Sequence, residues 1–112
     1  MPFICHAQTE TELVVKEVFK NDPVMIEIAR CESNYRQYND DGTTLRGVVN
    51  PLDKGAYQLN EKYHLESSRN MGLDINTLQG NLVYAWYLHY MQGESPWSAS
   101  KSCWNKPTFA TR

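Results

Sequence analysis

The sequence predicts an α+β fold that is mainly helical, with one small β-hairpin, in a single domain over residues 1–112. Apolar residues recur at helical spacing within the segments 10–20, 23–32 and 75–92. The stretch 34–51 differs, because a polar turn there is flanked by tyrosines and threonines. With 41% apolar and 12% aromatic residues, the chain has the composition of a folded domain with a modest core.

Two helices are predicted near the start of the chain, over 10–20 and 23–32. Thr9 lies three residues before a glutamate, which is the spacing of a capping box. Asp22 is the expected N-cap of the second helix, and Pro23 fits its first helical position. One face of this helix is apolar and should be buried. It consists of Val24, Met25, Ile28 and Ala29.

The β-hairpin is predicted around Asn39-Asp-Asp-Gly42, a strong turn signal. Val48-Val49 could add a third short strand.

Two further helices follow, over 61–71, ending before Gly72, and over 75–92, with Asp74 as N-cap. The second should be the central core element, and the segment 95–104 should form a compact aromatic end. The apolar stripe expected to face the core comprises Ile75, Leu78, Leu82, Ala85 and Trp86.

Charge and hydropathy exclude two classes of protein. A net charge of −2 without a basic run disfavours a nucleic-acid binder, and no segment reaches the roughly 20 apolar residues of a membrane span.

Residues 1–8 lack the features of an intact signal peptide, and both they and 105–112 should be loose. His6, His64 and His89 have no ligand spacing, so no metal or other cofactor is expected, and a domain of this size should be a monomer.

Two carboxyls point to general-acid chemistry. Glu32 leaves an apolar helix and is followed by Ser33-Asn-Tyr35, and Asp53 opens the string Asp53-Lys-Gly-Ala-Tyr-Gln-Leu-Asn60. A half-buried carboxyl keeps its proton at neutral pH while a better-solvated partner stays ionised, which suits cleavage of a glycosidic bond. Asp53 could instead belong to a plain turn after Asn50-Pro51, and Asp40 or Asp41 could be the second carboxylate.

These strings resemble the lysozyme superfamily. Animal c-type lysozymes carry Glu-Ser-Asn-Phe followed by Asp-x-Gly-x-x-Gln-Ile-Asn, and the Gly-x-x-Gln-apolar part is also typical of soluble lytic transglycosylases. The Cys-Glu-Ser string at Cys31 is similar to that of resuscitation-promoting factors. The pattern Asn81-x-x-x-Ala-x-Tyr-Leu88 resembles the transglycosylase helix that follows the cleft. The resemblance covers roughly residues 22–104.

The resemblance implies a lysozyme-like fold whose β-hairpin forms one wall of a cleft for peptidoglycan strands. Glu32 would be the general acid at the bond between N-acetylmuramic acid and N-acetylglucosamine, and Asp53 would be the second carboxylate. Gly55 would adopt a positive φ or let the chain approach the sugar. Tyr57 could contact sugar or simply pack, and Tyr84 and Trp97 could be cleft or core residues. The substrate-binding residues expected on this basis are Ser33, Tyr57, Gln58, Asn60, Tyr84 and Trp97.

The similarity to resuscitation-promoting factors also implies a disulfide between Cys31 and Cys103, which leaves Cys5 unpaired. Such a bridge indicates a secreted or cell-envelope protein, whereas two buried free thiols would indicate a cytosolic one.

Three functions fit the resemblance. A lysozyme would hydrolyse the bond with help from Asp53, and a lytic transglycosylase would need no second carboxylate and would leave 1,6-anhydro ends. A non-catalytic module of the same fold would only bind glycan or a partner protein.

Overall fold

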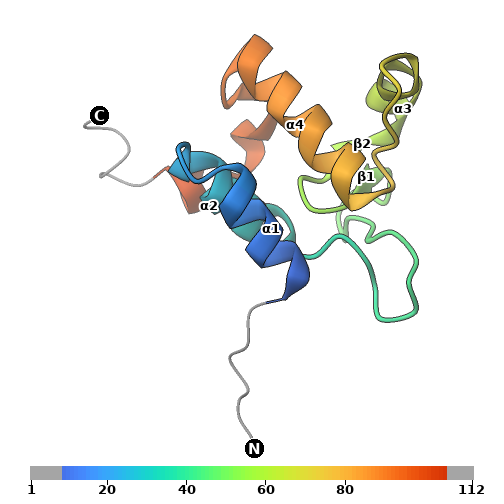
Figure 1. Ribbon diagram of the computed structural model, residues 1–112, viewed down its shortest axis with the longest axis horizontal. Coiled ribbons are helices and arrows are strands. Elements are labelled where there is room, and N and C mark those ends of the chain that lie inside the picture. Colours follow the sequence, from blue (N-terminus) through green and yellow to red (C-terminus); the bar gives the residue numbers. More distant parts are fainter. Residues whose placement is uncertain (1–8, 106–112) are drawn as a thin grey trace, which may run out of the picture.

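The computed structural model describes residues 9–105 (Figure 1). The fold is α+β and mainly helical, as predicted. Residues 1–8 and 106–112, for which loose ends are predicted, lie outside the described residues, and Cys5 and His6 lie there too. The elements are α1 (Glu10–Val18), α2 (Pro23–Ser33), β1 (Asp53–Lys54), β2 (Leu59–Asn60), α3 (Glu61–Asn70), α4 (Leu78–Gln92), the 3-10 helix η1 (Ser95–Ser100) and α5 (Lys101–Trp104).

The first two helices start where the sequence predicts. Thr9 caps α1, since its hydroxyl accepts a hydrogen bond from the Glu12 amide at 3.0 Å. The Glu12 carboxylate pairs with Lys16 at 2.8 Å, so it does not complete a capping box. Asp22 precedes α2 but forms no capping hydrogen bond with its side chain. Its carboxylate lies 3.2 Å from His89 Nδ1 at the far end of α4 instead.

The start of α4 is three residues later than predicted. Asp74 does not cap it, because the Asp74 carboxylate accepts a hydrogen bond from the Asn76 amide in a local turn at 2.9 Å. Thr77 caps the helix instead, accepting from the Gly80 amide at 3.0 Å. Trp86 was expected in the core, but its side chain is 55% exposed.

The β structure differs from the predicted hairpin. The turn 39–42 brings Tyr38 opposite Thr44 in a single isolated bridge, and no regular strands flank it. Residues 48–49 are not a strand, since both valines are fully exposed in a loop without a neighbouring strand. The two-stranded antiparallel sheet pairs β1 with β2, with Asp53 opposite Asn60.

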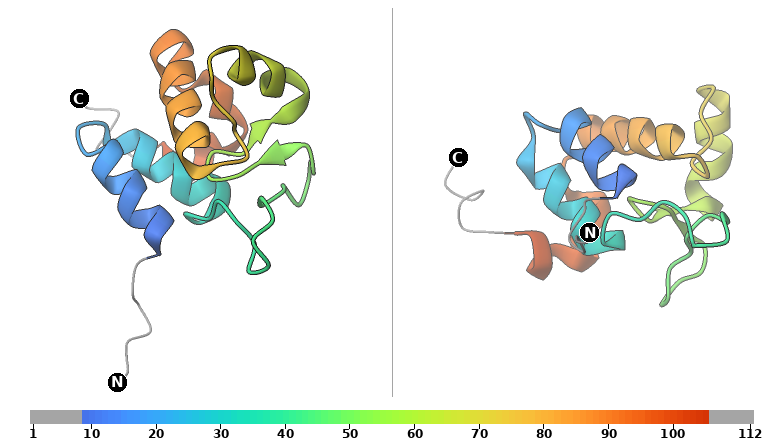
Figure 2. Two further views of the ribbon diagram at one scale, coloured as in Figure 1. Left: turned by 45° about the vertical axis from the view of Figure 1, so that its right-hand side comes forward. Right: turned by 60° about the horizontal axis from the view of Figure 1, so that its bottom comes forward.

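The helix α4 lies between two parts of the molecule. Figure 1 shows α1 and α2 on one side of it and α3 with the sheet on the other, and Figure 2 shows the same order from a second direction. The segment 95–104 turns back after α4 and packs on α2. The end of α2, the sheet and this returning segment therefore come together in space.

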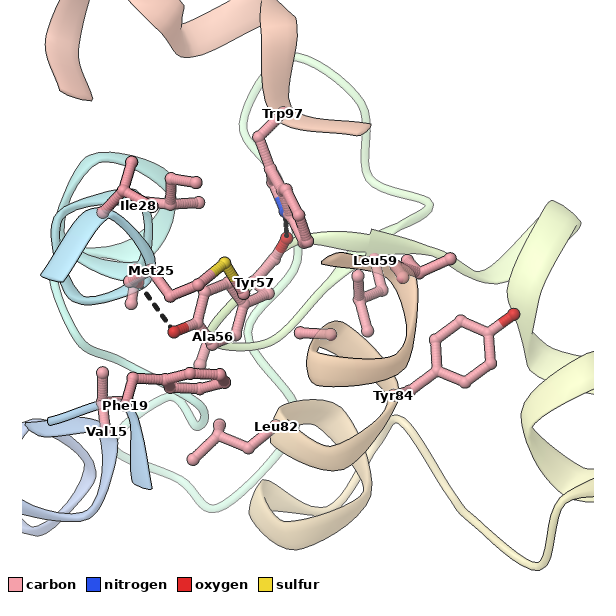
Figure 3. Close-up of a cluster of buried hydrophobic side chains, with 14 of the residues drawn as sticks. Val15, Phe19, Met25, Ile28, Ala56, Tyr57, Leu59, Leu82, Tyr84 and Trp97 are labelled. Atoms are coloured by element: carbon pink, nitrogen blue, oxygen red, sulfur yellow. Dashed lines mark hydrogen bonds between the residues drawn. The ribbon is translucent and has the colours of Figure 1, made fainter. Parts of the chain in front are cut away.

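Tyr57 lies at the centre of the core (Figure 3). Its side chain is fully buried, and its ring packs edge-on against Phe19 and Trp97, with centroids 5.6 and 5.8 Å away. Its hydroxyl donates to the Met25 carbonyl at 2.8 Å, and its own carbonyl accepts from Trp97 Nε1 at 3.0 Å. One residue thus connects α1, α2 and η1 to the turn that follows β1.

The side chain of Asn81, in α4, bonds the backbone of this turn. The side chain is fully buried, and its oxygen accepts from the Tyr57 amide at 2.9 Å. Its nitrogen donates to the carbonyls of Lys54 and Ile75, both at 2.9 Å. Each of these backbone groups is removed from water, so the amide provides hydrogen bonds that no strand supplies.

Gln37 bonds the same turn beside Asn81. Its oxygen accepts from the Ala56 amide at 2.8 Å, and its nitrogen donates to the Ile75 carbonyl at 3.2 Å. Gly55 lies against the two amides with φ +75°, as the sequence predicts. The close approach is to protein rather than to a sugar, because a Cβ here would lie 2.5 Å from the Gln37 oxygen and 2.6 Å from the Asn81 nitrogen.

Gly55→Ala should therefore destabilise the protein more than Gly72→Ala. Gly72 has nearly the same φ, +78°, but a Cβ there meets no atom within 4 Å. The backbone penalty of about 1–2 kcal/mol applies at both positions, and crowding should add about 1–3 kcal/mol at Gly55 alone. Urea unfolding of the two variants measures the difference, and equal losses would contradict the crowding.

Candidate active site

A groove passes Glu32 on both sides. It consists of three adjoining hollows of about 300, 430 and 250 Å³, and Glu32 and Gln58 line all three. The first hollow lies against α3, the end of α4 and η1, and the last lies between the end of α2 and the loop 45–48. A groove that continues past a carboxyl in two directions can hold a polymer at a point within its chain.

Glu32 stands in the last turn of α2 with its carboxyl half-buried. Burial raises the pKa of Glu32 above its usual value, a hydrogen bond from Ser100 lowers it, and the charge of Asp53 raises it again; the net shift is upward. The Ser100 hydroxyl donates to Glu32 Oε2 at 2.5 Å. Glu32 therefore holds its proton to a higher pH than a solvated glutamate does.

Asp53 is brought beside Glu32, as the sequence predicts. It lines two of the three hollows with Glu32 and is partly exposed. Asn60, its partner across the sheet, donates from Nδ2 to Asp53 Oδ1 at 3.1 Å. Asp40 and Asp41, the rival carboxylates, lie in the exposed turn 39–42 and do not line any of these hollows.

Gln58 is a predicted substrate-binding residue that lines all three hollows. Its φ of +50° is uncommon for a residue with a side chain, and its amide nitrogen donates to the Gly55 carbonyl at 3.0 Å. Gly47 leaves room for it, because a Cβ there would lie 2.8 Å from Gln58 Oε1. The backbone at Gln58 is thus held in a strained conformation by the tight turn.

The amide of Asn60 has two structural partners. Besides the bond to Asp53, its oxygen accepts from the Lys62 amide at 3.0 Å and so caps α3. Asn60 lines the first hollow and orients the second carboxylate there.

Three of the predicted contact residues are buried instead. Ser33 lies 2.8 Å from the Ala56 carbonyl and ties α2 to the turn after β1. Tyr57 is in the core, so packing replaces the predicted sugar contact. Tyr84 is also buried, and its hydroxyl donates to Ser67 Oγ at 3.1 Å. Tyr57 and Tyr84 support the groove without lining it, whereas Ser33 lines the last hollow with its hydroxyl bonded to backbone.

Trp97 is almost fully buried but lines the first hollow. Its carbonyl accepts from Trp104 Nε1 at 3.0 Å and lies 3.2 Å from Ser100 Oγ. These bonds fix the turn of η1 that presents Ser100 to Glu32.

Other groove residues were not predicted. Ser100 is the most consequential, and a serine in the serine-rich stretch 95–102 carries no signal that it will meet Glu32.

Tyr63 and His64 of α3 also line the first hollow. Burial lowers the pKa of His64, which lies beside Tyr84. A tyrosine next to a histidine, three residues after the motif that ends at Asn60, was the available signal for this pair.

The predicted disulfide between Cys31 and Cys103 is present. It joins the residue before Glu32 to α5, so it holds the segment that carries Ser100 against α2. In the chain-entropy description, closing a loop with 72 residues of separation contributes about 4 kcal/mol.

Within residues 9–105 no three histidine, cysteine, aspartate or glutamate side chains are placed to hold a metal ion. None of the helices in the same range has the length and apolar composition that crossing a membrane requires.

Comparison of the chain with protein-family models, with curated protein sequences and with solved structures found no match.

The charge on Glu32 should cost stability at neutral pH. A carboxyl whose pKa is raised in the folded state stabilises the fold fully below the unfolded pKa, near 4.5, and this contribution is lost as pH rises through the folded pKa. Glu32→Gln stays neutral, so its free energy of unfolding relative to wild type should be higher at about pH 8 than at about pH 4. Urea unfolding at both pH values measures this. The exposed Glu66→Gln is the control, and a difference independent of pH would refute the expectation.

Removing the hydroxyl of Ser100 should raise the pKa of Glu32 further, because that hydrogen bond stabilises the charged carboxylate. The side-chain carboxyl carbon of Glu32 can be followed by NMR during a pH titration of wild type and Ser100→Ala. The exposed Ser98→Ala should leave the titration unchanged. A pKa that falls or stays constant in Ser100→Ala would show that the contact does not act on the acid.

Proposed function

We propose that the protein is a glycoside hydrolase of the lysozyme type, with a lysozyme-like fold. It cleaves the β-1,4 bond between N-acetylmuramic acid and N-acetylglucosamine in peptidoglycan. The observation that carries the proposal is the pairing of Glu32, whose pKa is raised mainly by burial, with Asp53 in one groove open on both sides. The resemblance of the two motifs to the lysozyme superfamily supports the choice of substrate.

Glu32 acts as the general acid. Ser100 donates to Oε2, so Oε1 is the oxygen free to carry the proton and deliver it to the glycosidic oxygen. The carboxylate of Asp53 stabilises or attacks the sugar carbon as the bond breaks. Water then completes the reaction, with Glu32 acting as base. The chemistry uses these two carboxyls and requires no cofactor.

Hydrolysis is favoured over the anhydro-forming reaction by the position of Asp53. A lytic transglycosylase needs no second carboxylate, whereas here Asp53 lines the groove beside the acid and is oriented by Asn60. Asn81, which opens the transglycosylase-like pattern, is buried and bonds the backbone after β1. Its role in the scaffold suits either chemistry.

The disulfide supports a location outside the reducing cytosol. Bridges of this kind persist in oxidising compartments, where peptidoglycan is also found. We therefore assign the protein to the secreted or cell-envelope class, acting as a monomer on glycan strands.

The products formed from purified peptidoglycan test the proposal. Wild type should release fragments with reducing muramic ends, detected by mass spectrometry. Glu32→Gln should lose at least about 100-fold in rate, since general-acid catalysis contributes about 10²–10⁴-fold. Asp53→Asn keeps the shape and an acceptor for Asn60, and it should also be strongly impaired.

Other product patterns would contradict the proposal in distinct ways. Anhydro-muramic ends, with Asp53→Asn as active as wild type, would establish a lytic transglycosylase. Binding of glycan by wild type and Glu32→Gln alike, without products from either, would establish a non-catalytic module.

A further inference from the structure

We propose that the end of the groove between α2 and the loop 45–48 binds a carboxylate of the peptide stem attached to muramic acid. This inference rests on the proposed function and adds to it a preference for stem-bearing glycan. The hollow at this end has a volume of about 250 Å³ and is lined by three arginines, Arg30, Arg36 and Arg46. Glu32, at its inner edge, is the one acidic residue among the described residues that line it.

The three arginines differ in whether a carboxylate of the protein already pairs with their guanidinium group. Arg30 is paired with Glu27 at 3.0 Å and is therefore neutralised. Within residues 9–105 the Arg36 side chain bonds only the Ser33 carbonyl, at 3.3 Å, and no carboxylate lies within 4.0 Å of its guanidinium. It offers a free positive charge at the side of the groove.

Arg46 is partly available. Its guanidinium bonds the Pro51 carbonyl at 2.9 Å and lies 3.5 Å from the Glu61 carboxylate, with 51% of the side chain exposed. Glu61 is shared with the buried Lys54, which lies closer at 3.1 Å. Arg36 and Arg46 thus line one hollow and both have unused donors, an arrangement that suits a carboxylate.

The opposite end of the groove has a different character. Its described lining includes Asp53, Tyr63, His64 and Trp97 and contains no lysine or arginine. The groove is therefore cationic at one end and acidic and aromatic at the other. N-acetylglucosamine units are neutral and have no charge to pair with the cationic end, whereas a peptide stem carries free carboxylates. Val48, fully exposed beside Arg46, offers an apolar contact for the alanyl methyl groups of the stem.

Binding and turnover can be measured with matched glycans. Affinity is measured in the Glu32→Gln background, with a disaccharide that carries a tetrapeptide stem and with the same disaccharide without it. Turnover is measured on peptidoglycan that has been freed of phosphate-bearing polymers, before and after an amidase removes the peptide stems. We expect a preference for the stem-bearing ligand of about tenfold, the lower range for hydrogen bonds to charged groups. Arg36→Gln should abolish most of that preference, and Arg36→Lys should retain part of it.

Arg69→Gln is the matched control, because it removes one positive charge from an exposed site outside the groove. It should keep the full preference. Raising the salt concentration should weaken the preference in wild type, as expected for exposed charges.

The outcomes separate this inference from the proposed function. Cleavage with no preference for stems, or a preference that Arg36→Gln retains, overturns the carboxylate site and leaves the hydrolase in place. Equal losses on both substrates in Arg36→Gln would mean that the arginine contacts sugar, which also overturns it. No cleavage and no binding of either ligand would overturn both.

Discussion

The groove depends on two buried amides. Gln37 and Asn81 lie side by side, since both donate to the Ile75 carbonyl, and together they bond backbone groups of residues 54–57. Because both side chains are fully buried, an altered partner would leave polar backbone groups without hydrogen bonds. Asp53 precedes this turn and Gln58 follows it. The position of both groove residues therefore follows from contacts made beneath the surface that the substrate would touch.

The proposed acid is assembled from segments that are far apart in the chain. Glu32 ends α2, the charge that acts on it comes from β1, and its hydrogen-bond donor comes from η1. Burial and the nearby carboxylate both favour the neutral form, so the folded protein resists the charge that Glu32 carries in water. Such a site is tolerated because the disulfide and the core around Trp97 hold the segment 95–104 against α2. The free energy of unfolding is therefore lowered by the residue that the chemistry needs as a protonated carboxyl.

Local signals in the sequence were sufficient for several features. Thr9 caps α1, and the motif residues Glu32 and Asp53 do line one groove. The sheet was missed because strands of two residues have no periodicity to detect. Asp74 and Thr77 are both good caps, and only the local turn decides between them. Tyr57 and Ser100 could not be placed, because burial of a tyrosine and contact across 68 residues depend on tertiary packing.

The contact of α2 with residues 95–104 also determines when the site can form. A chain emerging from the ribosome exposes α2 before η1 has been made, and until then Glu32 lacks the hydrogen bond and the groove wall that residues 95–104 supply. The acid acquires its properties only when residues 95–104 have been made and have folded back over it. The cleft is therefore completed only after residues 95–104 have been made, and a shorter nascent chain lacks this part of the site.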